Sequence, residues 1–423
     1  MRISWAAAVL CLAALAVLVL AAAPAAADGR TTIADGTAWN SERKVAAAPD
    51  GTVYVSYVDR VNGTTAVFVK RSTDDGNSWT VLPQLSTAEA FRVCVAVDST
   101  GRLHVAWTEV AGANRQLFYA RLDGASSWTP RLQISDTPGY SGYPSIGVDS
   151  ADRIHVVWYG FDGANYQIYY RYLDGAGWHD TVQATHGADD ANNPAIAIGP
   201  DDVVHVAFFS VVGTLEDVYY MAGGPSGWSL ERVNPARVPS SRPSIVVHDD
   251  GRPAIAYASG NNASVEVRVA ERDVVDGWSS NVGVSLLGEG ADNPSLAADD
   301  AGNLAVFYET AAGDIRYRAR IGANWSEPVT VSAVRPARWP SASWARFPAE
   351  TTGVVRVVWT EESASTFFVN FTSVRIFPTP VCHNCDPDPL RGWGVPLLFV
   401  GAATAAVAAV AIASYRTKGG GRP

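Results

Sequence analysis

Apolar and aromatic positions recur along this chain at an interval of about fifty residues. The recurring unit is a short run of alternating apolar and polar residues that ends on an aromatic residue, first seen at Val53–Tyr57. Seven runs end on Tyr57, Trp107, Trp158, Phe208, Tyr257, Tyr308 and Trp359, which are 50, 51, 50, 49, 51 and 51 residues apart. Alternation with a period of two is typical of a half-buried β-strand. Seven copies in register therefore predict a repeat architecture built from strands.

Two further series keep nearly the same spacing. One consists of Trp79, Trp128, Trp178, Trp228, Trp278 and Trp325. The other consists of Pro144-Ser145, Pro194-Ala195, Pro243-Ser244, Pro294-Ser295 and Pro340-Ser341. In the third copy, residues 144–149, 154–159, 166–172 and a segment after Trp178 that ends near Ala184 predict four antiparallel strands, because turns with Asp and Gly separate them.

A four-stranded unit of this length, repeated seven times, predicts a seven-bladed β-propeller over residues 28–377. Separate sandwich domains need roughly 100 residues each, and the coils of a solenoid are much shorter. The seventh copy has only three strands and no tryptophan unit after Phe377, whereas residues 30–36 resemble the ends of other repeats. We therefore expect the N-terminal strand to complete the last blade and to remove two open sheet edges.

The two ends of the chain indicate a location outside the cell for the propeller. Residues 1–27 combine Arg2, a long apolar run and a small-residue site after Ala27, which predicts a cleaved signal peptide; an uncleaved anchor is the alternative. Residues 395–415 carry no charge and are long enough for one transmembrane helix. Basic residues in the tail, 416–423, predict that this tail is cytoplasmic. Both readings of the N-terminus leave residues 28–377 on the external face of the cell membrane.

Residues 378–394 contain four prolines and predict an extended stalk. The stalk holds Cys382 and Cys385, and a pair at this spacing in an oxidising compartment favours a disulfide over a metal site. Whether these cysteines pair with each other or between chains is left open. Cys94 lies in an apolar strand and is expected to be a buried thiol.

Composition narrows the function classes. The formal charge of −10 and the pI near 5.2 argue against a nucleic-acid partner, whose phosphates need a basic surface. The chain has no glycine-rich phosphate loop and no His-Glu-x-x-His motif, so neither a cofactor nor a metal is predicted. His104, His155 and His205 share one repeat position, but they lie in successive blades, and we expect hydrogen bonding in the core or between blades rather than a shared ion.

The segment from Ser72 to Trp79 is a turn with its own chemistry. Ser72 and Asp74 can accept hydrogen bonds from turn amides, Gly76 permits a positive φ, and Trp79 can pack between strands. This segment resembles the Asp-box of the sialidase-like (BNR/Asp-box repeat) superfamily, and degenerate versions occur at 122–128 and 173–178. The resemblance covers most of residues 28–377 and implies a propeller.

The same resemblance implies a possible activity. Sialidases of the superfamily bind the substrate carboxylate with three arginines and use a Tyr–Glu pair as nucleophile and a separate Asp as acid and base. Phe91-Arg92-Val93 resembles the Phe-Arg-Ile-Pro motif of these enzymes, with Cys94 in the place of the proline. The pair Tyr308-Glu309 resembles the nucleophile pair, but Tyr308 occupies the packing position of the repeat, so a structural role is expected.

The candidate site is the channel-mouth face of the propeller, where the repeats stop resembling each other. The predicted ligand-binding residues lie where the innermost strands begin and are Arg43, Arg92, Tyr143, Asn193, Arg242, Asn293, Arg338 and Trp339. Two residues past the closing aromatics stand the candidate catalytic carboxylates Asp59, Glu109 and Glu361. The alternative for these charges is a belt of surface ion pairs, which contribute little individually.

Three functions remain open on the sequence. The first is a cell-surface propeller that binds an extracellular glycan or protein. The second is an exo-glycosidase of the sialidase type that removes terminal acidic sugars. The third is a passive surface or adhesion scaffold. The sequence identifies neither the ligand nor the oligomeric state.

Overall fold

The structure is a computed structural model of the 423-residue chain. It describes residues 28–37, 43–234, 238–261, 264–273, 275–279, 281–332, 336–344, 353–363 and 366–377, without the side chains of residues 28 and 29. The predicted signal peptide, stalk with Cys382 and Cys385, transmembrane helix and tail lie outside these residues. Within the described ranges, no helix has the length and apolar character needed to cross a membrane.

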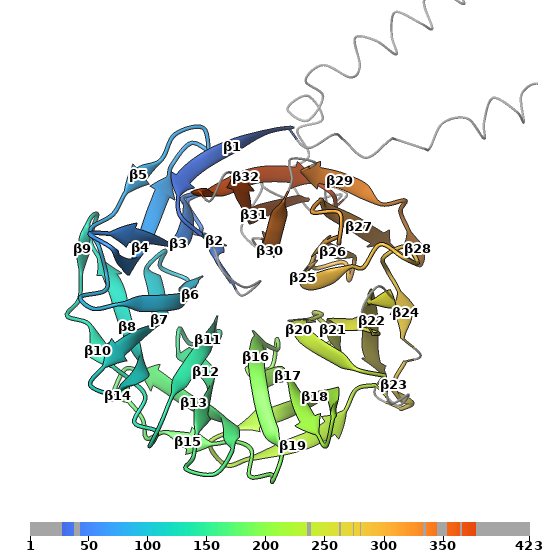
Figure 1. Ribbon diagram of the computed structural model, residues 1–423, viewed down its shortest axis with the longest axis horizontal. Coiled ribbons are helices and arrows are strands. Elements are labelled where there is room, and N and C mark those ends of the chain that lie inside the picture. The colour runs from blue at the N-terminus through green and yellow to red at the C-terminus, as the bar shows by residue number, and fades with distance from the viewer. Residues whose placement is uncertain are drawn as a thin grey trace, which may run out of the picture. The chain divides into compact units, whose positions relative to one another are not determined.

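The described residues form seven antiparallel sheets arranged as a ring (Figure 1), so the predicted seven-bladed, all-β propeller is confirmed. Blade 1 contains β2 (Val45–Ala47), β3 (Val53–Val61), β4 (Thr64–Ser72) and β5 (Thr80–Val81). Blade 2 contains β6 (Ala90–Val97), β7 (Leu103–Ala111), β8 (Asn114–Asp123), β9 (Ser127–Trp128) and β10 (Leu132–Gln133). Blade 3 contains β11 (Ser141–Val148), β12 (Ile154–Phe161), β13 (Tyr166–Asp174), β14 (Gly177–Trp178) and β15 (Val182–Gln183).

The remaining blades follow the same order from the channel outward. Blade 4 contains β16 (Asp190–Ile198), β17 (Val204–Val212), β18 (Leu215–Gly224) and β19 (Gly227–Arg232). Blade 5 contains β20 (Ser240–Val247), β21 (Pro253–Ser259), β22 (Glu266–Asp273), β23 (Gly277–Trp278) and β24 (Val282–Gly283). Blade 6 contains β25 (Asp292–Ala298), β26 (Leu304–Glu309), β27 (Ile315–Ile321), β28 (Asn324–Trp325) and β29 (Val329–Ser332). Blade 7 contains β30 (Ala337–Trp344), β31 (Val354–Ser363), β32 (Thr366–Arg375) and β1 (Asp28–Asp35).

Strand β1 closes the ring as the sequence predicts. It pairs antiparallel with β32 and forms the fourth strand of blade 7, next to it in Figure 1 although the two are far apart in sequence. Arg30 Nη1 contacts both carboxylate oxygens of Glu361 at 2.7 and 2.8 Å, and Ile33 is buried in the core. The first and last parts of the propeller are therefore joined by a sheet, an ion pair and apolar packing.

The outermost strand differs from the single strand expected after Trp178. In blade 3 it consists of two short pieces, β14 and β15, which both pair with β13. Leu173 lies opposite Trp178, whereas Tyr169 lies opposite Gln183, so one extra residue separates the two registers. Such a bulge interrupts the ladder and bends the strand at an exposed edge.

The two aromatic series have different packing roles. Trp107, Trp158 and Trp359 of the closing series are fully buried. The second series packs across blade boundaries: Trp178 of blade 3 meets Tyr119 of blade 2 edge-to-face, with ring centroids 5.0 Å apart. The same contact recurs for Trp228 with Tyr170 at 5.3 Å, Trp278 with Tyr220 at 5.1 Å, and Trp79 with Phe371 at 5.1 Å. Edge-to-face pairs at this distance stabilise the contact beyond simple burial.

The turn from Ser72 to Trp79 is held by side-chain hydrogen bonds. The amide of Gly76 donates to Ser72 Oγ at 2.8 Å, and the amide of Ser78 donates to Asp74 Oδ1 at 2.8 Å. Hydrogen bonds to its carboxylate from the hydroxyl and the amide of Ser78 and from the hydroxyl of Ser72 lower the pKa of Asp74 to about 2. Gly76 has a φ of +91°, and a Cβ there would lie 2.3 Å from the ring of Phe371 in blade 7. The turn of blade 1 therefore also packs against blade 7.

The three repeated histidines hydrogen-bond within their own blades. The Nδ1 atoms of His104, His155 and His205 lie 2.7, 2.8 and 2.6 Å from the hydroxyls of Tyr119, Tyr170 and Tyr220. These tyrosines belong to the set that receives the inter-blade tryptophans. The histidines therefore hold the packing aromatics in place, and burial lowers the pKa of His205 to about 4.

Candidate functional site

The innermost strands begin with an unusual backbone conformation. Six non-glycine residues there have a left-handed φ of 37° to 53°, one in each of blades 2 to 7: Arg92, Tyr143, Asn193, Arg242, Asn293 and Trp339. A register shift in the pairing of the innermost strand occurs at the same point in each of these blades. Bulges redirect side chains, and left-handed residues with a Cβ are strained conformations that concentrate at functional sites.

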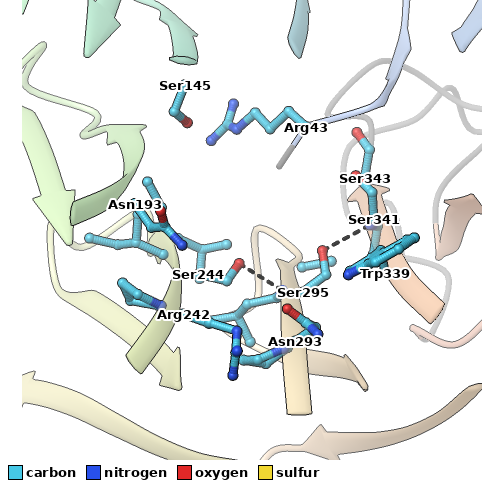
Figure 2. Close-up of a pocket in the computed structure, with 18 of the residues that line it drawn as sticks. Arg43, Ser145, Asn193, Arg242, Ser244, Asn293, Ser295, Trp339, Ser341 and Ser343 are labelled. Carbon is cyan, nitrogen blue, oxygen red and sulfur yellow. Dashed lines mark hydrogen bonds between the residues drawn. The ribbon is translucent and has the colours of Figure 1, made fainter. Parts of the chain in front are cut away.

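All six side chains line one central cavity of 520 Å³. Arg43 and Arg338 line it as well, so the structure brings together all eight residues predicted to bind a ligand. Figure 2 shows Arg242, Asn293 and Trp339 around the cavity, with Arg43 reaching from the opposite side towards Ser145. The volume lies within the range of about 300–1,000 Å³ that is usual for small-molecule sites. The ligand-binding role of these residues stays a prediction.

Serines of the Pro-Ser series hydrogen-bond four pairs of neighbouring blades around this cavity. The backbone amide of Leu296 donates to Ser244 Oγ at 3.0 Å, and the amide of Ala342 donates to Ser295 Oγ at 2.9 Å (Figure 2). Ser145 and Ser341 accept the same bond from the amides of Ile196 and Lys44, at 3.2 and 2.9 Å. Each serine therefore fixes the innermost strand of the next blade, which keeps the cavity wall rigid.

Ala195 is the position in this series that lacks the hydroxyl. By the pattern of the other blades, a serine there would accept from the amide of Ile245 in blade 5. We expect Ala195→Ser to raise the free energy of unfolding by about 0.5–1.5 kcal/mol, the usual contribution of an added hydrogen bond. Ser295→Ala should lower it by about 1–3 kcal/mol, because a buried amide loses its acceptor. Chemical denaturation measures both, and a destabilised Ala195→Ser would contradict the pattern.

The four arginines of the cavity have different partners. Arg43 Nη2 donates to the carbonyl of Ile196 at 2.9 Å, across the channel from blade 1 to blade 4. Arg92 Nη2 donates to the hydroxyl of Tyr143 at 2.6 Å, and its guanidinium lies over that ring, 4.3 Å from the centroid. Arg43 also borders a second cavity of 210 Å³, so its side chain forms part of the cavity floor.

The other two arginines, Arg242 and Arg338, differ in whether a carboxylate pairs with their charge. Arg242 Nη1 contacts the two carboxylate oxygens of Asp292 at 2.9 and 2.7 Å. Arg338 is exposed, and its guanidinium makes no hydrogen bond or ion pair within the described part of the chain, although its charge acts to lower the pKa of Glu309. Of the four, Arg338 therefore offers its guanidinium most directly to a ligand.

Glu309 is a cavity residue that the sequence analysis considered only as part of the pair Tyr308-Glu309, for which a structural role was expected. Its carboxylate accepts from Asn293 Nδ2 at 2.9 Å and from the amide of Trp339 at 2.7 Å. Burial raises the pKa of Glu309 despite these two donors. Glu309 on β26 lies directly opposite Asp292 on β25, so two carboxyl groups share one part of the wall.

The three candidate catalytic carboxylates lie elsewhere. Trp107 Nε1 donates to Glu109 at 2.8 Å, and Trp359 Nε1 donates to Glu361 at 2.9 Å. Both carboxylates are buried, and none of the three, Asp59 included, is among the described residues that line the central cavity. Glu109 and Glu361 stand two residues past the closing tryptophans, and a strand places such residues on the same face. They therefore point between blades, whereas Glu309, one residue past Tyr308, points into the cavity.

The Tyr–Glu geometry implied by the sialidase resemblance is not formed at Tyr308. Tyr308 is fully buried, and its hydroxyl lies 3.4 Å from Glu289 rather than near Glu309. Tyr143 is the tyrosine of the cavity wall, and Arg92 is the partner that the structure gives its hydroxyl. Glu309 differs from its repeat equivalents Val58, Thr108, Tyr159, Phe209, Ala258 and Thr360 in being charged. That contrast is the sequence signal that identifies it.

Comparison with known proteins supports the fold and leaves the family open. No family model matches the chain, and no curated protein sequence matches it. An ulvan lyase of polysaccharide lyase family PL25 is similar in structure, with a TM-score of 0.58, 14% identity, and coverage of 80% of this chain and 95% of that chain. A protein of unknown function from Dyadobacter fermentans has a TM-score of 0.52 at 12% identity, over 83% and 100% of the two chains. Sialidase propellers are also similar, including a leech intramolecular trans-sialidase with a TM-score of 0.43, 12% identity, and coverage of 66% of this chain and 67% of that chain.

Proposed function

We propose that this protein is a cell-surface propeller that binds acidic glycans in its central cavity. The observation that carries the proposal is the set of six strained, non-glycine residues that direct guanidinium, amide and aromatic side chains into one cavity. Planar polar groups suit sugar hydroxyls and carboxylates, and aromatic rings suit the apolar face of a sugar. A cavity of 520 Å³ accommodates one or two sugar units better than the broad surface of a folded protein.

The charge of the cavity supports an acidic ligand. Its described lining contains four arginines and two carboxyl groups, Asp292 and Glu309, in a protein of net charge −10. A basic cavity in an acidic protein attracts an anion locally while it repels anions elsewhere. The similar ulvan lyase is bound to a glucuronate and sulfated rhamnose unit, which is consistent with an acidic sugar in a propeller of this shape.

The proposal is tested by presenting the protein to an array of acidic and neutral glycans. We expect retention on glycans with exposed carboxylate or sulfate groups, and loss of this retention in Arg338→Ala. Binding that is equally strong on neutral glycans would contradict the proposal. The absence of binding to any glycan would favour the passive scaffold.

Glycoside hydrolysis is the second candidate, and the carboxyl pair Asp292–Glu309 is the observation that favours it. Hydrolysis of a glycosidic bond generally needs one carboxyl group that is protonated and one that is ionised. Arg242 contacts both carboxylate oxygens of Asp292 at 2.9 and 2.7 Å, while burial raises the pKa of the neighbouring Glu309. A carboxyl group whose pKa is raised by burial is a candidate for the acid role, which makes Glu309 the candidate here. Turnover of a fluorogenic sialoside or an acidic oligosaccharide by wild type, and its loss in Glu309→Gln, would establish this function.

Glu309 also predicts a pH dependence of stability. Its pKa is raised on folding, so between the ordinary and the raised pKa the folded protein binds more protons than the unfolded chain. Its contribution to stability is therefore lost as pH rises through this window. We expect the melting temperature of wild type to fall more steeply with pH there than that of Glu309→Gln. Parallel curves for the two proteins would contradict the raised pKa.

A further inference from the structure

Blade 3 carries a cluster of aromatic rings beside the central cavity. The cluster consists of Tyr140, Tyr143, Tyr159, Phe161 and Tyr166, all half-buried. The ring of Tyr159 lies 5.3 Å from that of Tyr143, 5.6 Å from that of Tyr140 and 5.3 Å from that of Tyr166, between centroids. Phe161 extends the cluster at 5.4 Å from Tyr166. The rings therefore form one continuous aromatic surface.

The topology places this surface on the same face as the cavity mouth. Tyr140 immediately precedes β11, Phe161 ends β12 and Tyr166 begins β13. These three points lie at one end of the blade, where β11 is the innermost strand and β13 is farther from the channel. Tyr143 belongs to both the cavity wall and the cluster. The aromatic surface thus starts in the cavity and extends outward over blade 3.

Packing of the propeller does not require aromatic residues at these positions. The equivalents of Tyr159 in the other blades are Val58, Thr108, Phe209, Ala258, Glu309 and Thr360. The equivalents of Phe161 are Arg60, Val110, Val211, Gly260, Ala311 and Glu362. Glycines give the rings room: a Cβ at Gly142 would lie 2.2 Å from the hydroxyl of Tyr140, and one at Gly139 would lie 2.9 Å from Phe161. The cluster is therefore a local feature of blade 3 rather than part of the repeat.

We infer that this aromatic surface is a second binding subsite, which holds further sugar units of a glycan chain whose acidic unit occupies the central cavity. The inference rests on the proposed function, because the cavity supplies the anchor. Aromatic faces bind the C–H face of a sugar ring, and tyrosine hydroxyls bond sugar hydroxyls. The continuity through Tyr143 fixes the direction of the chain, from the cavity outward over blade 3. The ligand is then an oligosaccharide or polysaccharide rather than a single terminal sugar.

The test measures how the affinity for an oligosaccharide depends on its length, in the full-length wild type and in variants of the aromatic cluster. The probes are galacturonate oligomers and heparin-derived oligosaccharides of increasing length, titrated by calorimetry. Wild type is expected to bind at least one of the two series. Within that series, we expect the longer oligomers to bind at least ten-fold more tightly than the shortest member. Tyr166→Ala should remove this gain and leave the affinity for the shortest member unchanged. Tyr172→Ala is the matched control, because Tyr172 lies on the same strand but stacks on His179, outside the cluster.

The possible outcomes separate the inference from the proposed function. Equal affinity of wild type for short and long oligomers would overturn the subsite and leave the cavity function standing. A length gain that survives in both Tyr166→Ala and Phe161→Ala would also overturn it. Failure of every oligomer to bind wild type would overturn the proposed function itself. Unchanged binding of the shortest member shows that a variant is folded, and if Tyr166→Ala fails this criterion, Phe161→Ala decides.

Discussion

Deletion of residues 28–36 should lower the free energy of unfolding by about 4–6 kcal/mol. Burial of Ile33 contributes about 1.5–3 kcal/mol, and removal of Arg30 leaves the buried carboxylate of Glu361 without its cation, for which about 3 kcal/mol is the low end. Since folded proteins are stable by about 5–15 kcal/mol, this is a large fraction of the total. The melting temperature should fall by more than about 10 °C.

Two point variants show whether the buried contacts of β1 stabilise the propeller, as distinct from any change to this strand. Ile33→Ala keeps the strand and removes its apolar contact, and we expect a loss of about 2–4 kcal/mol. Asp35→Asn changes an exposed side chain on the same strand and should shift the melting temperature little. The deletion should also promote association, because β32 becomes an open edge. An unchanged melt after deletion would mean that β1 does not close the propeller.

Arg338→Ala should weaken the binding of an acidic glycan about ten- to hundred-fold. The guanidinium lines the cavity and makes no hydrogen bond or ion pair among the described residues, so a ligand carboxylate can use its hydrogen-bonding capacity. Hydrogen bonds to charged groups contribute about 1.5–3 kcal/mol, which corresponds to this change in affinity. Arg92→Lys should also weaken binding, because lysine cannot reproduce the planar contact of arginine with a carboxylate.

The control is Arg252→Ala, in the turn between β20 and β21 at the other end of blade 5. The side chain of Arg252 is 40% exposed and contacts Asp250 at 2.7 Å, away from the cavity. This substitution should leave both affinity and melting temperature nearly unchanged, since exposed ion pairs contribute little. A loss of affinity as large as that of Arg338→Ala would indicate a general charge effect and not a site.

The fold could be predicted from the sequence because packing requirements repeat. The closing aromatics, the inter-blade tryptophans and the Pro-Ser pairs each perform the same task in successive blades, so each leaves a periodic signal. Closure by residues 30–36 followed from the missing strand of the seventh copy. The split of the outer strand into β14 and β15 left no such signal, because a one-residue bulge at an exposed edge places few demands on the residues around it.

The site was predicted in part. The repeat register located the residues at the start of the innermost strands, and all eight line the cavity. The candidate catalytic carboxylates Glu109 and Glu361 stand two residues past Trp107 and Trp359. Side chains two residues apart on a strand share one face, so these carboxylates lie on the buried face of the tryptophans and not in the cavity. Glu309 could have been found in the sequence as the only charged residue among its repeat equivalents, but the register of the repeat alone does not show that its side chain points into the cavity. The partners of Arg242 and Arg92 depend on contacts between blades and along the wall, which the spacing of the repeats does not specify.

Acidic-glycan binding in the central cavity is tested by calorimetric titration of the protein with one acidic oligosaccharide and with the same oligosaccharide after reduction of its carboxyl groups. The oligosaccharide is the one that the glycan array retains most strongly. We expect saturable binding of the acidic form, and a loss of at least ten-fold in affinity for the reduced form and for Arg338→Ala. Equal affinity for the two forms, or binding that Arg338→Ala leaves intact, would contradict an acidic-glycan site in the central cavity.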